Sequence, residues 1–226
     1  MSNIAEARQK LVELCVELSA RGYLAATGGN VSLRVDTEHF LITPSATDYL
    51  AMRASDICLL RLSDLAKLER GRTPSVEKVL HARLFHGRPD AGCCIHTHQP
   101  VASACALMGK DLTVPEGEML SRLGPVIPLV GYAPSGTNWL AAKLARALRP
   151  DVNAYLLLNH GVVCCGAGIA ETVQTVEDLE AVTKSYLSAC IAERAGNAPQ
   201  LAPILTQIRD ALTKRHTLEP SGAKTR

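Results

Sequence analysis

The stretch Cys93-Cys94-Ile95-His96-Thr97-His98-Gln99-Pro100 places two histidines two residues apart at the end of an apolar run. In an extended strand, side chains at positions i and i+2 leave from the same face. We therefore expect His96 and His98 to point the same way, as two imidazoles must to share one metal ion at zinc–nitrogen distances of about 2.0–2.1 Å. Such pairs also occur in cores and on surfaces without a metal, so further ligands are needed before this one indicates a site.

Composition sets limits on fold and function. The chain has 226 residues, of which 47% are apolar, and this predicts a single domain over residues 1–226 with a loose polar tail from about residue 214. The net charge is only +2, the basic residues are scattered and aromatic residues make up 4%, so no nucleic-acid partner is expected. No apolar run reaches about 18 residues, so no membrane span is expected either.

The cysteines indicate a cytoplasmic protein. Most of them sit inside apolar runs and none forms a C-x-x-C pair, which favours reduced core residues over a disulfide framework. The N-terminal residues lack a basic region followed by an apolar stretch, so they do not resemble a signal peptide. The eight cysteines are Cys15, Cys58, Cys93, Cys94, Cys105, Cys164, Cys165 and Cys190.

Hydrophobic periodicity predicts alternating helices and strands. Helices are expected over residues 4–21, from Thr73-Pro74-Ser75 onward, and over 100–107, 138–148 and 169–195. Strands are expected over residues 31–35, 40–43, 57–62, 91–97, 125–130 and 154–158, with 162–165 as a continuation of the last strand. This order predicts an α/β fold, a single domain with a mixed central β-sheet covered by helices.

A third histidine follows another predicted strand. Asn159-His160-Gly161 comes directly after Leu158, and loops at strand ends are where sites are usually built. Three histidines with one open position are the usual ligand set of a catalytic zinc. A turn histidine hydrogen-bonded to backbone is the alternative reading of His160. His81 and His86 are expected to cap or line their helix rather than to bind metal.

Glu77 and three polar turns complete the set of candidates. An acidic residue at the start of a helix favours the helix dipole, and the functional alternative is a metal ligand or general base. The turns are rich in hydroxyls and backbone N–H groups, which suits ordinary turns and phosphate binding alike. They are Thr27-Gly28-Gly29-Asn30, Pro44-Ser45-Ala46 and Thr73-Pro74-Ser75. The sequence contains neither the phosphate-binding loop motif G-x-x-x-x-G-K-[ST] nor a G-x-G-x-x-G motif after a predicted strand, so nucleotide binding is not expected.

Taken in order, these motifs resemble the class II aldolase/adducin family, in its L-fuculose-phosphate aldolase-like branch. The resemblance covers about residues 5–195 and implies the class II aldolase-like fold. The motifs that carry it are Thr27-Gly28-Gly29-Asn30-Val31-Ser32-Leu33-Arg34, Ile42-Thr43-Pro44-Ser45, Pro74-Ser75-Val76-Glu77, His96-Thr97-His98, Tyr132-Ala133-Pro134-Ser135-Gly136-Thr137 and Asn159-His160-Gly161.

The resemblance also implies residue roles. A divalent metal, usually Zn²⁺ with Mn²⁺ or Co²⁺ as alternatives, would be held by His96, His98 and His160, and by Glu77 when substrate is absent. Glu77 would be the acid/base carboxylate, and Tyr132 would protonate the aldehyde oxygen. The substrate phosphate would be surrounded by Thr27, Gly29, Asn30, Ser45 and Ser75. The family implies a homotetramer with active sites at subunit interfaces.

The implied reaction belongs to carbohydrate metabolism. A zinc-dependent aldolase of this kind cleaves a ketose 1-phosphate to dihydroxyacetone phosphate and an aldehyde, through a metal-stabilised enediolate. A sugar-phosphate 4-epimerase, a dehydratase and a metal-dependent decarboxylase are alternatives on the same scaffold, and a non-catalytic adducin-like binding module is a further one. Two departures leave the substrate open: Val76 replaces a frequent second serine, and no tyrosine follows Tyr186.

Overall fold

The computed structural model describes residues 4–24 and 28–214. Its contacts group the chain into two compact units, Met1–Glu180 and Ala181–Arg226, and helix α6 (Ile169–Asn197) runs through the boundary between them. The candidate site lies in the first unit. The predicted single domain over residues 1–226 stays a prediction, and almost all of the tail from about residue 214 lies outside the described residues.

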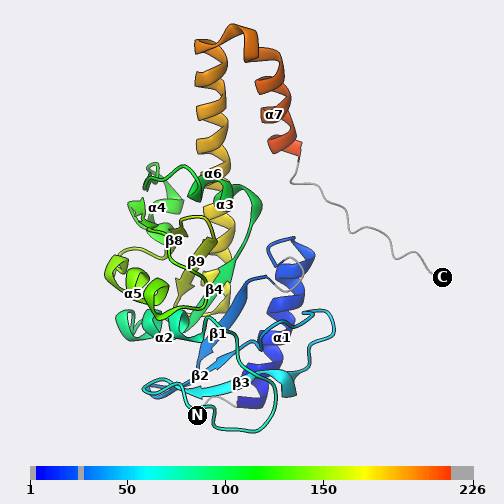
Figure 1. The fold of residues 1–226 in the computed structure, drawn as a ribbon, viewed down its shortest axis with the longest axis vertical. Helices are drawn as coiled ribbons and strands as arrows, with labels where there is room; N and C mark the ends of the chain where they lie inside the picture. The colour runs from blue at the N-terminus through cyan, green and yellow to red at the C-terminus, as the bar shows by residue number, and fades with distance from the viewer. Residues whose placement is uncertain (1–3, 25–27, 215–226) are drawn as a thin grey trace, which may run out of the picture. The chain divides into compact units, whose positions relative to one another are not determined.

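A seven-stranded sheet forms the centre of the first unit (Figure 1). Strands β7 and β8 are parallel and all other neighbours are antiparallel, so the predicted mixed sheet is confirmed. Across the sheet the order is β3 (Cys58–Arg61), β2 (His39–Ile42), β1 (Asn30–Arg34), β4 (Cys93–Thr97), β9 (Gly161–Gly166), β8 (Ala154–Leu157) and β7 (Leu129–Val130).

Helices cover both faces of this sheet. On one face, α2 (Lys78–Gly87) and α5 (Asn138–Ala147) pack on each other and on a core of strand side chains that includes Phe40 and Tyr155. Helix α1 (Ile4–Ala20) lies on the other side in Figure 1, contacts β1 and buries one apolar stripe. That stripe consists of Leu11, Leu14, Cys15 and Leu18, as its three- and four-residue spacing predicted.

The end of β4 is held on three sides. Its neighbour β1 pairs Asn30 with His96, and its other neighbour β9 pairs Val163 with His96. Pro100 then begins α3 (Pro100–Ala106), as a proline at the first turn of a helix should. The Glu180 carboxylate accepts hydrogen bonds of 3.0 Å from two backbone N–H groups of that turn. The backbone that carries the histidine pair is therefore fixed before any ligand binds.

Three predicted elements differ in the structure. Residues 125–130 form two strands, β6 (Val126–Ile127) and β7, because Pro128 between them has no N–H to donate; β6 pairs with β5 (Leu112–Thr113) in a separate two-stranded sheet. Residues 162–165 belong to β9, which turns back antiparallel to β8 instead of continuing it, because Asn159 adopts a left-handed conformation with φ 57°.

The helix predicted from Thr73-Pro74-Ser75 begins only at Lys78. The preceding residues are held in an extended bridge, with Pro44 opposite Pro74 and the Ser75 N–H donating to Thr43 O at 3.1 Å. Glu77 is consequently the residue just before α2 rather than part of its first turn.

Short elements escaped the sequence analysis because a few residues carry no periodicity. They are η1 (Ala54–Asp56), β5, α4 (Glu118–Leu123) and η2 (Pro199–Leu201), together with the longer α7 (Ala202–Lys214) of the second unit. In that second unit, Lys184 donates to Thr213 O at 3.2 Å, which ties α6 to α7. Within residues 4–24 and 28–214, no helix is long and apolar enough to cross a membrane. All eight cysteines carry free thiols, and seven are buried, which confirms them as core residues.

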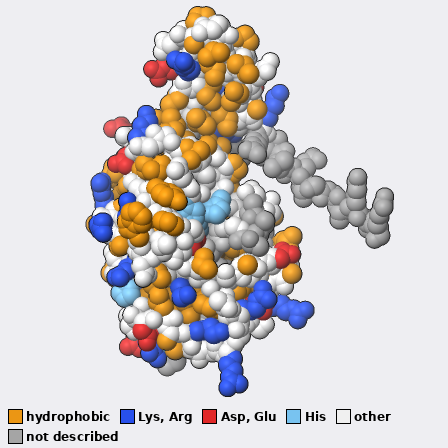
Figure 2. Space-filling model, viewed as in Figure 1, with side chains coloured by type: hydrophobic (Ala, Val, Ile, Leu, Met, Phe, Trp, Pro, Cys, Tyr) orange, Lys and Arg blue, Asp and Glu red, His pale blue; other side chains and the backbone are white. Residues whose placement is uncertain are grey.

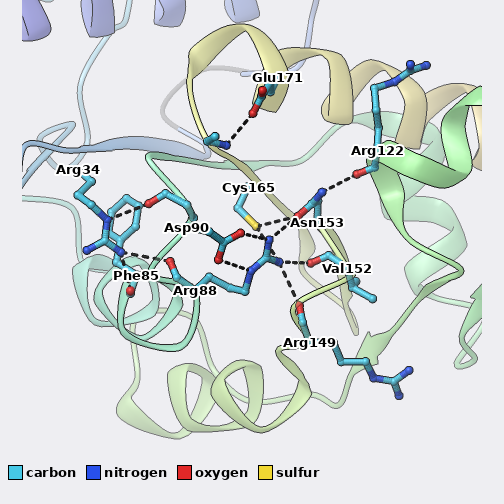
Figure 3. A network of polar contacts seen from close by, with 12 residues as sticks. Arg34, Phe85, Arg88, Asp90, Arg122, Arg149, Val152, Asn153, Cys165 and Glu171 are labelled. Atoms are coloured by element: carbon cyan, nitrogen blue, oxygen red, sulfur yellow. Dashed lines mark hydrogen bonds and ion pairs between the residues drawn. The ribbon is translucent and has the colours of Figure 1, made fainter. Parts of the chain in front are cut away.

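A buried arginine joins the end of α2 to the beginning of β8 (Figure 3). The Arg88 side chain is 5% exposed and forms a two-point ion pair with Asp90, at 2.6 and 2.9 Å. It also donates to the Asn153 side chain at 2.8 Å and to the carbonyls of Arg149 and Val152. Since buried carbonyls need partners, this guanidinium and the Tyr155 hydroxyl, which also donates to the Arg149 and Val152 carbonyls, together satisfy this group of acceptors.

We predict that Arg88→Met lowers the free energy of unfolding by about 2–4 kcal/mol, because it removes a buried donor from the Arg149, Val152 and Asn153 oxygens and the ion-pair partner of Asp90. Urea denaturation followed by circular dichroism measures this. Arg83→Met, on the exposed side of the same helix, is the matched control and should change stability by less than about 0.5 kcal/mol. Equal stability of the two variants would show that the network around Arg88 contributes nothing.

Candidate metal centre and active site

Three histidines converge at one end of the central sheet. His96 and His98 come from the end of β4, and His160 comes from the turn between β8 and β9. One ligand atom from each lies within 4.8 Å of the others, and the Nε2 atoms of His96 and His98 are 3.1 Å apart. His96 is buried, His160 is half-buried and His98 is exposed, so the cluster opens to solvent on one side.

The turn that carries His160 depends on its two neighbours. Asn159 takes the left-handed conformation, which asparagine tolerates better than most residues. A Cβ atom at Gly161 would lie 2.5 Å from Thr97 O and 2.6 Å from the His98 ring. Only glycine allows β9 to approach the histidine pair this closely, and the sequence Asn-His-Gly is therefore what brings His160 to the other two rings.

The donor set fits a divalent transition metal. His96 Nδ1–H donates to Val162 O at 2.8 Å, which leaves the lone pair of Nε2 facing the other two rings. Ligand nitrogens around a tetrahedral zinc lie about 3.4 Å apart, given bonds of about 2.1 Å, and the 3.1 Å between the Nε2 atoms of His96 and His98 is close to that distance. Three imidazoles with an open side match the ligand set of a catalytic rather than a structural site.

Glu77 lies against the three rings. Its carboxylate is buried, with Oε2 3.2 Å from His96 Nε2 and Oε1 3.4 Å from His160 Nε2. Asn30 Nδ2 donates to Oε2 and Ser135 Oγ donates to Oε1, both at 2.8 Å. Each carboxylate oxygen thus has one hydrogen-bond donor and one imidazole beside it.

This arrangement determines the charges in the site. Burial alone would raise the pKa of Glu77, but His96, Asn30, His160 and Ser135 together outweigh it and lower the pKa to about 2. Burial, followed by repulsion from His96 and His160, lowers the pKa of His98 to about 4. Burial and His96 lower the pKa of His160 as well. At neutral pH the site therefore presents an ionised carboxylate beside metal-binding imidazoles.

The predicted phosphate-binding turns lie on neighbouring backbone segments. The Ser45 N–H donates to Thr73 O at 2.9 Å, and Ser75 follows two residues later, so both hydroxyls belong to adjacent segments. Ser75 is buried and its Oγ accepts from the Glu77 N–H at 3.2 Å. Ala46 adopts φ 49°, a left-handed conformation that costs a residue with a side chain about 1–2 kcal/mol.

The glycine-rich turn approaches the histidine strand. A Cβ atom at Gly29 would lie 2.6 Å from His96 O. The residue also has φ 81°, so both the close approach and the backbone conformation require glycine at this position. Asn30 beside it is buried and directs its amide at Glu77. Thr27 lies outside the described residues. Tyr132 is 51% exposed, on the segment after β7, and no contact joins it to Glu77.

The sequence did not predict the contribution of two residues near Glu77. Ser135 had no role of its own within the motif that contains it, and His81 was expected to cap or line its helix. His81 is fully buried, and its ring contacts Asn30 Oδ1 and Ser32 Oγ, the latter at 2.6 Å. A signal was present, because Glu77 and His81 stand four residues apart, and Asn30 and Ser32 share one face of a strand.

Comparison with known proteins shows the family of this chain. The sequence model of the class II aldolase and adducin N-terminal domain matches residues 9–187. The chain belongs to the class II aldolase and adducin family. The resemblance found in the sequence is thereby confirmed.

The relatives of this chain within the class II aldolase family bear the names of different enzymes. The chain is 29% identical to an L-fuculose phosphate aldolase of Haemophilus influenzae, over 82% of this chain and 84% of that protein. It is also 29% identical to a methylthioribulose-1-phosphate dehydratase of Serratia proteamaculans, over 75% and 88%. A solved L-fuculose 1-phosphate aldolase superimposes with a TM-score of 0.77 at 28% identity, over 87% and 89%.

We predict that His96→Ala reduces bound zinc from about one per chain to near zero, because the variant loses the central imidazole and keeps only His98, His160 and the Glu77 carboxylate as ligands. Metal content after dialysis, measured by atomic emission, tests this. His39→Ala is the control, since His39 lies at the far end of the β1–β2 hairpin and pairs with Asp36. One zinc per chain retained in His96→Ala would contradict the ligand set.

Proposed function

We propose that this protein is a zinc-dependent aldolase that cleaves a ketose 1-phosphate, of the fuculose-phosphate type, to dihydroxyacetone phosphate and an aldehyde. The observation that carries the proposal is the ionised, buried Glu77 against three converging imidazoles. The aldolase relatives support the reaction class. Zn²⁺ is the expected metal, with Mn²⁺ or Co²⁺ as alternatives, and its chemistry would be Lewis-acid polarisation of the substrate carbonyl.

The chemistry assigned to this chain's residues is proton transfer. In the condensation direction, Glu77 as carboxylate removes a proton from the hydroxyl-bearing carbon of dihydroxyacetone phosphate. The carbon then bonds to the aldehyde, whose oxygen takes a proton from the Tyr132 hydroxyl. Cleavage is the reverse, with Tyr132 accepting the hydroxyl proton and Glu77 returning a proton to the carbon. The low pKa of Glu77 supports its ionised starting form.

The phosphate would bind at the polar turns. Ser45, Ser75, Gly29 and Asn30, with Thr27, are the proposed surroundings of the substrate phosphate. The pairing of the Ser45 and Ser75 segments supports this, because the Ser45 N–H donates to Thr73 O and the Ser75 hydroxyl accepts from the Glu77 N–H. Asn30 differs from the other proposed phosphate-binding residues, because its side-chain amide already forms hydrogen bonds with Glu77 and His81. A role in carbohydrate metabolism and a cytoplasmic location belong to the same proposal.

We also propose a homotetramer with active sites at subunit interfaces. Exposed apolar side chains beside Glu77 and Ser135 support this, because Val76, Tyr132 and Trp139 are each more than half exposed. Figure 2 shows hydrophobic side chains gathered next to histidine side chains on one face.

Light scattering of the purified protein should give about four times the 24.2 kDa chain mass if the protein is a homotetramer. A monomer at micromolar concentration would contradict this assembly.

We predict that zinc-loaded protein releases dihydroxyacetone phosphate from one member of a panel of ketose 1-phosphates, followed with a coupled enzyme. Glu77→Gln should keep the metal and lose about 10²–10⁴-fold in turnover, because an amide cannot accept the proton. Glu118→Gln, in the exposed first turn of α4, is the matched control and should keep full turnover.

Two outcomes would redirect the proposal. Near-normal turnover of Glu77→Gln would assign the proton transfer to another group. Substrate loss without dihydroxyacetone phosphate release would favour a dehydratase, the second candidate, which the Serratia relative supports. Pentulose 5-phosphates in the same panel test the 4-epimerase alternative, and β-keto acids test the decarboxylase.

A further inference from the structure

A line of four buried polar side chains runs from the core to the candidate active site. Ser32 and His81 are fully buried, and Asn30 and Glu77 are 5% and 4% exposed. Ser32 Oγ lies 2.6 Å from His81 Nδ1, His81 Nε2 contacts Asn30 Oδ1, and Asn30 Nδ2 lies 2.8 Å from Glu77 Oε2. The line crosses from β1 to α2, back to β1, and then to the residue before α2.

The chemistry of each group fixes the direction of every hydrogen bond in this line. The Glu77 carboxylate only accepts, so the Asn30 NH₂ group must face it, and the Asn30 carbonyl oxygen must then face His81. The Asn30 carbonyl oxygen only accepts, so the ring nitrogen that faces it, His81 Nε2, must carry a proton. Full burial favours the neutral ring and lowers the pKa of His81 to about 3, so Nδ1 accepts from the Ser32 hydroxyl.

The opposite tautomer would undo this order. With the proton on Nδ1, the Nε2 lone pair would face the Asn30 carbonyl oxygen, and neither group could donate to the other. Rotating the Asn30 amide by 180° would satisfy His81 but turn the carbonyl oxygen toward the Glu77 carboxylate, where the two oxygens repel. The position of the proton on the His81 ring therefore decides whether Glu77 Oε2 receives a hydrogen bond from the Asn30 NH₂ group.

We propose that His81 is a positioning residue which, as its Nε2–H tautomer, holds the Asn30 amide with its NH₂ group toward Glu77 and so fixes the carboxylate for proton transfer. This inference rests on the proposed acid/base role of Glu77. Orientation matters here because small displacements of a reacting group cost large factors in rate. His81 acts through Asn30, since neither of its ring nitrogens contacts Glu77 or a metal-binding histidine.

Three variants separate positioning from simple core filling. In His81→Leu we expect kcat to fall about 10–100-fold, with KM within about 3-fold and zinc content unchanged. In His81→Gln the side-chain NH₂ can replace Nε2–H, so kcat should return to within about 5-fold of wild type. Phe85→Leu, fully buried on the same helix and outside the line, is the matched control: its melting temperature should fall while its kcat stays unchanged.

The kinetic outcomes are decisive in both directions. Equal kcat for His81→Leu and wild type, or a His81→Gln variant as slow as His81→Leu, would overturn the proposal. Loss of zinc in His81→Leu would also overturn it, by showing that the ring supports the metal ligands instead of the carboxylate.

A second measurement does not need turnover. Nitrogen-15 NMR of histidine-labelled wild-type protein, metal-free and zinc-loaded, should show the His81 ring neutral and protonated on Nε2, with the signal assigned within the wild-type protein by its contacts with Asn30 and Ser32. An Nδ1–H tautomer would overturn the proposal even if the variants do not fold. If no sugar phosphate is turned over, the proposed function fails, while an Nε2–H ring and a shift of the Asn30 side-chain amide in His81→Gln would still uphold the positioning contact.

Discussion

The buried carboxylate of Glu77 is the constraint on which the site depends. A carboxylate that is removed from water costs several kcal/mol unless charges and hydrogen-bond donors replace its hydration. Here the replacement comes from four separate parts of the chain: Asn30 on β1, His96 on β4, His160 on the β8–β9 turn and Ser135 on the loop before α5. Each contact is long-range, so the carboxylate is oriented, and its buried charge compensated, only when the sheet has formed.

The order of the strands is what makes this convergence geometrically feasible. Because β4 is central, it can receive β1 on one edge and the β8–β9 hairpin on the other, and both neighbours deliver their site residues at its His96 end. The approach of β9 is limited by side-chain bulk, which is why Gly161 follows His160 directly. Moving β9 outward by the width of one methyl group would separate His160 from the pair, and the three-nitrogen ligand set would be lost.

The parts of the site that follow from local periodicity could be predicted from the sequence. The two-residue spacing of His96 and His98 fixes their common face, and the position of His160 after an apolar strand places it at a sheet end. The order of motifs then identifies the family. Contacts made across the fold could not be read this way: nothing local shows that Ser135 reaches Glu77, or that His81 faces Asn30. The boundary of α2 was wrong for the same reason, since the bridge between Pro44 and Pro74 is a long-range contact that overrides helix propensity.

Glu77 has one rigid side and one exposed side, and this division bears on which reaction the scaffold carries out. Asn30 and His81 hold one carboxylate oxygen from within a packed interface of strand and helix, whereas Ser135 holds the other from a half-exposed segment beside Val76, Gly136 and Tyr132. A metal-polarised carbonyl and a carboxylate base serve carbon–carbon cleavage and loss of water equally well. The choice between them depends on which bond of the bound substrate is aligned with the carbonyl, and that alignment is set by the groups that contact the rest of the substrate. We therefore expect the exposed side, where Val76 presents an apolar side chain, to set the specificity of this chain.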